Sequence, residues 1–330
     1  MTLDANPHTI PVFDRRTLLT GAAALTAAGA FHPDASHAQP VPNSVGTNPP
    51  RLKAPANACD CHHHIYDPSR FAFAPNAGRN SPSNGTAADY QLLQKRIGTT
   101  RSVVVQPRNY AVDNAVTLDA IERLGPNNTR GVAVLHPTVT DAELKKLNDG
   151  GVRGIRFTLG DPATAVVTVD MIEPLAKRIA NLGWHIQFNV SGDQIVELAG
   201  LMRGLPTSMV FDHLANPPLP AGPDHPSHAI VRGLIDQGRT WVKLSGAYAN
   251  SKVGPPAYPE ATRIAQAFVK AAPQRLVWGS DWPHPALPDN NKPDDALLFD
   301  LMSEWAPDEA TRNRILVDNP AMLYGFPKVG

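Results

Sequence analysis

Residues 57–66 read NACDCHHHIY, a short run that joins a buried strand to three consecutive histidines. Side chains alternate along a strand, which predicts two faces, one with Asp60, His62 and His64 and the other with Cys59, Cys61 and His63. The imidazoles of His62 and His64 would then converge at one end of the strand. Packing alone does not explain such a pair, whereas His63 by itself is expected to be structural.

Seven more short apolar runs follow this one, so the chain has eight candidate strands. They are Cys61–Tyr66, Val103–Val105, Val132–Leu135, Ile155–Phe157, Ile186–Phe188, Met209–Phe211, Trp241–Leu244 and Leu276–Trp278. Segments with apolar residues at helical spacing separate them, and two begin as capping boxes, Thr140 with Glu143 and Ser191 with Gln194.

Eight strand–helix repeats predict an α/β protein whose single domain, residues 57–330, closes as a (β/α)8 TIM barrel. The alternative is an open doubly wound sheet. A nucleotide-binding sheet of that kind usually has a glycine-rich phosphate loop after its first strand, and none follows residue 66.

The composition excludes several classes of protein. The 330 residues are 42% hydrophobic, with 30 basic and 30 acidic side chains, which is enough apolar material for one large core. A formal net charge of zero without basic runs provides no footprint for nucleic acid or for an anionic membrane surface. A small-molecule partner is therefore expected.

The N-terminal segment differs from the rest. Arg15 and Arg16 precede a run rich in alanine and glycine, and Ser36-His37-Ala38 offers a cleavage site, so residues 1–38 are interpreted as a cleaved twin-arginine export signal. This predicts a partner in the twin-arginine export machinery and a periplasmic or secreted protein. A basic tail without structure is the alternative. Residues 39–56 are rich in proline and form a linker or a wrapping arm.

The two cysteines, Cys59 and Cys61, are poorly placed for a disulfide because they are two residues apart on one strand. We expect both to be small buried residues on the outer face of the barrel.

Polar residues recur at the carboxyl ends of the predicted strands, where β/α barrels place their catalytic groups. They are His62, His64, Gln106, His136, Arg156, Gln187, His213 and Asp281.

Two motifs, VFDHL at 210–214 and VWGSDWPH at 277–284, complete a pattern with the His-x-His of the first strand. Together with GVRGIRF at 151–157, KLSGAY at 243–248 and NPAMLYG at 319–325, they resemble the amidohydrolase superfamily. The resemblance is greatest to its branch of 2-pyrone-4,6-dicarboxylate lactonases and D-galactarolactone isomerases, and it covers nearly the whole chain after the signal.

His62, His64 and Asp281 could hold a divalent zinc or manganese ion. Metal-dependent members of the superfamily commonly add a histidine at the end of the fifth strand, and binuclear members often add a bridging lysine or glutamate at the fourth, where this chain has Gln187 and Arg156. A guanidinium cannot ligate a cation. The resemblance therefore implies lactone chemistry with no metal and no other cofactor. A mononuclear zinc- or manganese-dependent hydrolase or decarboxylase remains the alternative.

Opening a lactone requires a base, donors for the carbonyl oxygen and a proton for the leaving alkoxide. Asp281 is the expected base, and His62, His64 and His213 are the expected donors. Asp212 is expected to point away, between sheet and helices. Candidate substrate-binding residues are Arg156, Gln106, Arg108, Gln187, Tyr248 and His284.

The chain departs from dicarboxylate lactonases at three positions where these enzymes have arginines. It has Pro162, Asn216 and Ala249 there. Since arginine is the usual partner of a carboxylate, a sugar-acid lactone or another small organic-acid lactone is expected instead of a dianionic pyrone. Hydrolysis and isomerisation of the lactone both remain open. An exported protein that only binds small acids is the alternative from another class.

Overall fold

The computed structural model describes residues 39–75, 85–160 and 165–327. The predicted export signal and Pro162 lie outside these ranges. Eight parallel strands are hydrogen-bonded in chain order, from β1 to β8. They are β1 Cys59–His63, β2 Arg101–Val105, β3 Thr129–Ala133, β4 Val152–Thr158, β5 His185–Asn189, β6 Ser208–Phe211, β7 Thr240–Leu244 and β8 Leu276–Trp278.

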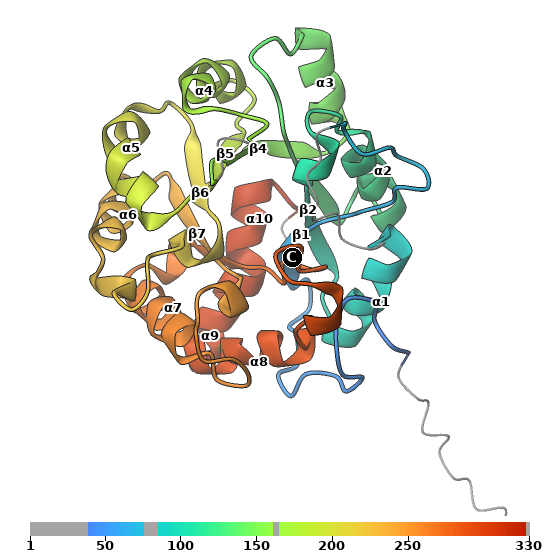
Figure 1. Cartoon of the computed structure of the whole chain (residues 1–330), viewed down its shortest axis with the longest axis vertical. Helices are drawn as coiled ribbons and strands as arrows, with labels where there is room; N and C mark the ends of the chain where they lie inside the picture. Colours follow the sequence, from blue (N-terminus) through green and yellow to red (C-terminus); the bar gives the residue numbers. More distant parts are fainter. Residues whose placement is uncertain (1–38, 76–84, 161–164, 328–330) are drawn as a thin grey trace, which may run out of the picture. The chain divides into compact units, whose positions relative to one another are not determined.

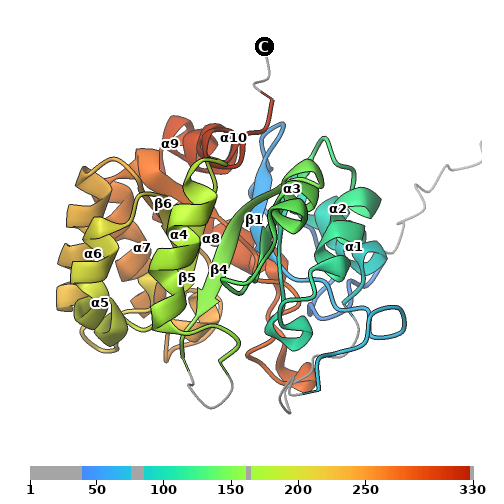
Figure 2. The same cartoon turned by 90° about the horizontal axis from the view of Figure 1, so that it is seen from above.

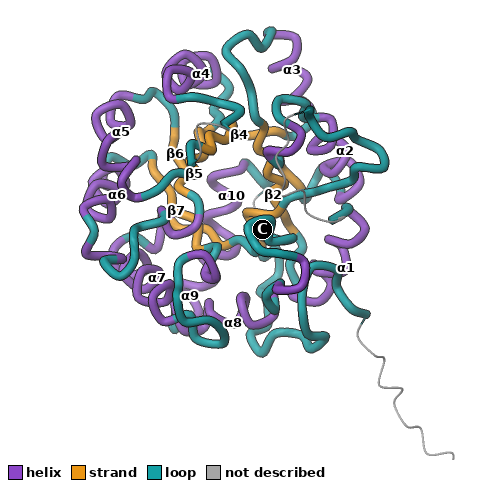
Figure 3. Tube along the Cα trace, in the orientation of Figure 1, coloured by secondary structure: helices purple, strands orange, loops and turns teal. Residues whose placement is uncertain are grey.

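Helices follow the strands, and most of them surround the strands as an outer ring, whereas the last helix lies within the ring in this view (Figures 1 and 3). They are α1 Ala87–Ile97, α2 Ala115–Leu124, α3 Asp141–Asp149, α4 Ile172–Ala180, α5 Gly192–Gly204, α6 Pro226–Asp236, α7 Pro259–Ala271, α8 Asp295–Trp305, α9 Glu309–Asn313 and α10 Asn319–Tyr324. The two predicted capping boxes are confirmed at the starts of α3 and α5. None of the described helices is long and apolar enough to cross a membrane.

The segment after β8 closes the ring against β1. The backbone N–H of Asp281 donates to the carbonyl of His62 over 2.8 Å, and the backbone N–H of His64 donates to the carbonyl of Trp282 over 2.8 Å. A parallel bridge joins His63 to Trp282. The protein is thus a (β/α)8 barrel, as predicted, and the open sheet is excluded. The same closure places the Asp281 side chain beside His62 and His64.

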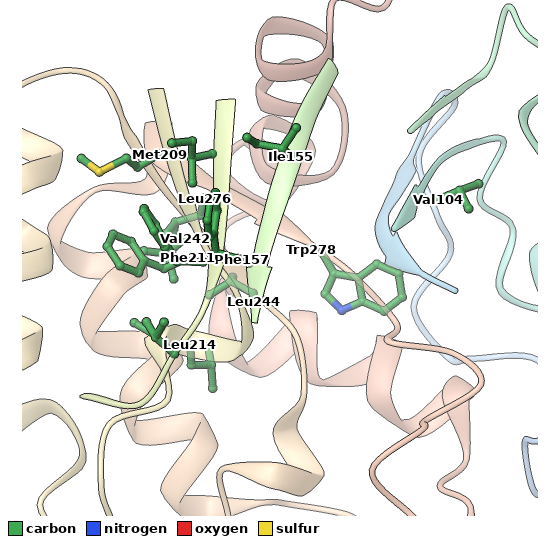
Figure 4. Close-up of a cluster of buried hydrophobic side chains, with 14 of the residues drawn as sticks. Val104, Ile155, Phe157, Met209, Phe211, Leu214, Val242, Leu244, Leu276 and Trp278 are labelled. Atoms are coloured by element: carbon green, nitrogen blue, oxygen red, sulfur yellow. The ribbon is translucent and has the colours of Figure 1, made fainter. Parts of the chain in front are cut away.

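Two apolar clusters fill the fold. The larger one lies between the strands and the helices, and Figure 4 shows part of it, including Val104, Phe157 and Phe211. The smaller cluster fills the barrel interior with Cys59, Cys61, Val103, Val105, Val132, Val210, Trp241 and Val277, together with Tyr324 and Phe326. In Figure 2, α9 and α10 lie at the end of the barrel opposite to the one toward which β4 points.

The prediction that the cysteines face outward is wrong, because β1 contains an irregularity between Asp60 and His63. Cys61 belongs to the interior cluster and His62 also points into the barrel, so two consecutive residues face inward. Asp60 instead accepts hydrogen bonds from Tyr90 of α1 and from Ser280. Both cysteines are free and buried, as expected.

The segment 39–56 packs on the barrel. Trp282 donates from its indole N–H to the carbonyl of Pro42 over 2.8 Å. Arg96 of α1 donates to the carbonyls of Val45 and Asn48. Leu52 donates its backbone N–H to the carboxylate of Asp300 in α8 over 2.8 Å. The arm therefore covers the helices that flank the junction of β1 and β8.

Candidate active site

Asp281 and three histidines form the centre of the carboxyl-terminal end of the barrel. Oδ1 of Asp281 is 3.4 Å from Nε2 of His62 and 3.4 Å from Nε2 of His64. Oδ2 is 3.9 Å from Nε2 of His213 and accepts a short hydrogen bond from the hydroxyl of Tyr248. The four predicted catalytic residues are thus brought together, and Tyr248 holds the carboxylate from the side.

Asp212 lies inside the barrel, which corrects the prediction that it points between sheet and helices. Its Oδ1 is 3.1 Å from Nδ1 of His62, and its Oδ2 accepts from Nε of Arg156 over 3.0 Å. Val210 faces inward, so alternation also turns Asp212 inward. His213 then adopts a left-handed backbone with φ 47°, and this brings a second consecutive side chain into the site.

Lys243 is a further residue of the site, which the sequence analysis did not identify. Its Nζ donates to Oε1 of Gln187 over 2.7 Å and lies 3.2 Å from Nδ1 of His62. It is also 3.5 Å from Oδ1 of Asp212. The sequence does contain a signal for it, a lysine between Val242 and Leu244 in an otherwise apolar strand. A lysine is buried in such a strand only when other polar groups pair with it, which indicates a polar site.

His64 has a defined tautomer. Its Nδ1 lies 2.7 Å from the carbonyl oxygen of Val105, which can only accept, so Nδ1 carries the proton. In the neutral ring Nε2 is therefore bare, and it lies 3.2 Å from Nε2 of His62. His213 contacts the hydroxyl of Ser245 over 3.0 Å through its Nδ1. A hydroxyl can donate or accept, so the tautomer of His213 is not fixed in this way.

Burial and charge set the protonation of the site. Burial raises the pKa of Asp281, but the electrostatic interactions with His213, His64 and His62 lower it by a larger amount, so its pKa lies well below the usual value. Burial lowers the pKa of His62, with Lys243 adding to the effect, and burial also lowers the pKa of His213. Burial raises the pKa of Tyr248. Asp281 is thus ionised near pH 7.

A cavity of about 340 Å³ opens above these residues. Its lining includes His64, His213, Asp281, Arg108, Arg156, Tyr248, Tyr66, Thr158, Asn189, Asn216, Ala249, Pro285 and Ala286. Three predicted substrate-binding residues, Arg108, Arg156 and Tyr248, therefore reach it. His62 is fully buried beneath it, and its Nε2 faces the carboxylate of Asp281.

The other three predicted substrate-binding residues lie behind the cavity wall. Gln187 is fully buried and binds Asp212 and Lys243. Gln106 donates to the carbonyls of Ala111 and Asp113. The ring of His284 is fully buried, 3.1 Å from Asp295, with its centroid 5.3 Å from that of Tyr248. These side chains support the site without touching the main cavity.

His136 is not part of the cluster either. Its Nε2 is 2.8 Å from the carbonyl of Val166, and its side chain lines a separate surface cavity between α2 and α3. His185 lies deeper in β5, as expected, where its ring packs against Tyr324 of α10 with centroids 5.4 Å apart.

Three atoms of the site are spaced as metal ligands would be. Nε2 of His62, Nε2 of His64 and Oδ1 of Asp281 lie 3.2–3.4 Å apart. Ligands about 2.0–2.2 Å from a tetrahedral zinc ion are separated by about 3.4 Å. The local charge gives no reason for a cation to bind. Among the described residues of this network, the negative charges of Asp281 and Asp212 are balanced by the positive charges of Arg156 and Lys243. The residues as they stand therefore match a metal site in spacing but not in charge.

Residues 59–326 match the model of the amidohydrolase family. The chain belongs to the amidohydrolase family. It is 35% identical to the 2-pyrone-4,6-dicarboxylate hydrolase of Comamonas testosteroni, with 83% of this chain and 92% of the relative covered. It is also 35% identical to the 4-sulfomuconolactone hydrolase of Rhizobium radiobacter, with 82% and 91% covered.

The D-galactarolactone isomerase of Agrobacterium fabrum is 28% identical, with 85% of this chain and 95% of the isomerase covered. A crystal structure of an Agrobacterium tumefaciens protein superposes with a TM-score of 0.79 at 27% identity, covering 87% of this chain and 99% of that one. The resemblance predicted from the motifs is thus confirmed, and the relatives of this amidohydrolase act on lactones by hydrolysis or isomerisation.

Proposed function

We propose that this amidohydrolase opens or isomerises the ring of a small organic-acid lactone without a metal ion. The observation that carries the proposal is the ionised Asp281 carboxylate held by three histidines at the base of the cavity. The named activities of the relatives support the same substrate class. A protein that only binds acids gains nothing from a buried carboxylate at its centre, because this group would repel the ligand.

Asp281 is the proposed base. It takes a proton from the attacking water, or from a substrate hydroxyl in an isomerisation, and the oxygen forms a bond to the lactone carbonyl carbon. The ring C–O bond then breaks, and Asp281 returns the proton to the leaving alkoxide. The short hydrogen bond from Tyr248 fixes one carboxylate oxygen, so the other faces His62 and His64.

The histidines stabilise the oxygen that gains negative charge. His213 lines the cavity and is placed to donate to the carbonyl oxygen, whereas His62 is fully buried and acts through its Nε2 on the Asp281 carboxylate. Nδ1 of His64 already donates to the Val105 carbonyl, so its Nε2 donates only when the ring carries a second proton and is bare in the neutral ring. In that state it accepts a hydrogen bond and orients the water or the His62 ring.

The wall of the cavity supports a lactone with one acidic group. Arg108 and Arg156 supply positive charge to the cavity, whereas Asn216 and Ala249, at positions where dicarboxylate lactonases have arginines, supply none. Asn189 and Asn216 offer amide groups to hydroxyls, as a sugar-acid lactone presents. A carboxylate beside Arg156 would form the charge-assisted pair that fixes the ring above Asp281.

A panel of lactones with a pH indicator tests the proposal. The protein should release one proton per ring opened from a mono-anionic sugar-acid lactone, and Asp281→Asn should abolish the signal. NMR of the product mixture detects isomerisation, which releases no net proton. Absence of turnover by both methods across neutral, mono-anionic and dianionic lactones would reject the proposal.

The spacing of His62, His64 and Asp281 keeps a second candidate function under test, a mononuclear zinc- or manganese-dependent hydrolase or decarboxylase. We expect protein purified without added metal to hold far less than one metal ion per chain and to retain its activity with a chelator. Stoichiometric metal, together with loss of activity on chelation, would replace the first proposal by this one.

A further inference from the structure

Nδ1 of His62 faces two groups that require opposite protonation states. Asp212 Oδ1, at 3.1 Å, could accept a proton from it, whereas the ammonium of Lys243, at 3.2 Å, can only donate one to it. A neutral imidazole carries a single proton. The contact that Nδ1 makes therefore determines whether Nε2, the atom that faces Asp281, carries a proton or a lone pair.

The surrounding hydrogen bonds favour the contact with Lys243. This side chain is fully buried, and Gln187 accepts one of its protons over 2.7 Å. The Nε2–H of Gln187 in turn donates to Oδ2 of Asp212 over 3.0 Å, and this orients the amide oxygen of Gln187 toward Lys243. Oδ1 of Asp212 lies 3.1 Å from Nδ1 of His62 but makes no hydrogen bond among the described residues, so this contact lacks the hydrogen-bond geometry that the Lys243 contact has. Nδ1 of His62 is thus the acceptor, and Nε2 carries the proton.

We propose that Lys243 is a positioning residue that fixes His62 as the Nε2–H tautomer and thereby keeps divalent metal ions away from His62, His64 and Asp281. A metal ligand must present a lone pair, and here a proton occupies it. Nε2 of His62, which carries that proton, lies 3.2 Å from Nε2 of His64 and 3.4 Å from Oδ1 of Asp281. The inference explains the metal independence of the proposed function, and its test requires no turnover.

Replacing Lys243 with methionine should convert the cluster into a metal site. Methionine fills a similar volume but donates no proton, so Nδ1 of His62 becomes free to donate to Asp212 Oδ1, 3.1 Å away. A carboxylate that orients a histidine in this way is a common support of zinc ligands. Two imidazole lone pairs and the Asp281 carboxylate would then meet at the spacing given above.

The first measurement is zinc per chain after incubation with zinc sulfate and desalting. Zinc affinity should rise about 10- to 100-fold in Lys243→Met over the unmodified protein, the range that supporting residues of metal sites provide. Lys270→Met, an exposed lysine of α7, should behave like the unmodified protein. Adding His64→Gln to Lys243→Met should abolish the gain. A folded Lys243→Met protein, judged by circular dichroism, without increased zinc binding would overturn the inference.

The second measurement reads the tautomer in the unmodified protein, and a variant serves only to assign the His62 signal. Nitrogen-15 NMR of labelled histidine should show His62, assigned by its loss in His62→Gln, with the proton on Nε2. A proton on Nδ1 would refute the role of Lys243. If the tautomer and zinc results hold but no lactone is turned over, only the proposed function fails. Turnover with the opposite tautomer rejects only the role of Lys243.

Discussion

Asp281 is ionised although it is only 5% exposed, and its neighbours explain why. The hydrogen bond from Tyr248 and the nearby imidazoles of His62, His64 and His213 stabilise its charge more than burial destabilises it. A base of low pKa is weak in water. Its contribution here comes from its position, because the oxygen it would deprotonate is held between it and the donors for the carbonyl.

Asp281→Asn should keep the fold and lower kcat by about 10³-fold or more, the scale of a lost acid–base group. An amide matches the carboxylate in shape and still accepts from Tyr248, so the cavity should persist. Steady-state kinetics on the best lactone of the panel, with thermal unfolding alongside, measures this. Asp236→Asn, at an exposed position in α6, is the matched control. Near-normal kcat in Asp281→Asn would remove the carboxylate from the mechanism.

Asn216→Arg should move the preference toward a dianionic lactone. The side chain of Asn216 lines the cavity and contacts the Val190 carbonyl over 3.2 Å, so a longer cation there would reach a second carboxylate. The ratio of kcat/KM for 2-pyrone-4,6-dicarboxylate over a mono-anionic lactone should rise about 10- to 100-fold, as charge-assisted hydrogen bonds allow. Asn216→Gln, which adds length without charge, should leave the ratio unchanged. An equal ratio in all three proteins would show that Asn216 does not select charge.

The individual roles of residues were only partly predictable. The His-x-His pattern and the motifs around His213 and Asp281 identified the centre of the site, because strand ends meet at one face of a barrel. Alternation failed at two points, Cys61 beside His62 and Asp212 beside His213, where consecutive side chains both face inward. The irregularity in β1 and the left-handed φ of His213 cause this, and neither position has a glycine or another local marker of it.

At the level of elements, the junction of β1 and β8 depends on close backbone contact. A Cβ added at Gly279 would lie 2.6 Å from Cβ and 2.8 Å from the backbone N of His62. The same junction carries the hydrogen bond from Asp281 N–H to the His62 carbonyl. Glycine at 279 therefore lets two strands approach and aligns the base with its histidine.

Gly279→Ala should destabilise the protein by about 1–3 kcal/mol, the usual cost of overpacking, and should lower kcat because His62 must shift. Urea unfolding and steady-state kinetics measure the two effects. Gly200→Ala in α5 is the matched control, since a Cβ there meets nothing within 4 Å and alanine favours a helix. Equal stability of the two variants would show that the backbone at residue 279 can move away from His62 without cost.

The elements themselves were predictable from period and length, since all eight apolar runs overlap strands or their carboxyl ends. Their bounds were less so. The predicted first strand, Cys61–Tyr66, extends beyond the observed Cys59–His63, because apolar residues such as Ile65 and Tyr66 continue into the loop and are buried there by neighbouring loops. Burial in a loop and burial in a strand give the same sequence pattern.

For the whole molecule, the number of strand–helix repeats predicted the barrel, but it did not predict which side chains meet inside the barrel. The interior holds apolar residues at one end and a buried charged network at the other. Lys243 appeared as an isolated polar residue in the sequence, and only the ring of strands brings it to Gln187 of β5 and His62 of β1. Contacts across a closed ring depend on register, which local patterns do not encode.

The buried histidines should make the fold sensitive to acid. Burial lowers the pKa of His185 from 6.5 to about 3, and burial also lowers the pKa of His62 and His213. The folded protein keeps these rings neutral, whereas the unfolded chain takes up protons below about pH 6.5. Their contribution to stability is therefore complete above that pH and is lost as the pH falls from about 6.5 toward 3.

His185→Gln tests this, because glutamine is polar but does not titrate and the residue lies outside the catalytic cluster. Between pH 6.5 and 4.5, protonation of His185 in the unfolded chain should cost the unmodified protein about 2–3 kcal/mol. Urea unfolding at several pH values should show a shallower loss in the variant, whatever its stability at pH 7. Gln237→Asn, at the exposed C-terminal cap of α6, removes no titrating group and should retain the full slope. If His185→Gln also retained it, then other groups, such as His62 and His213, would have to account for the acid loss.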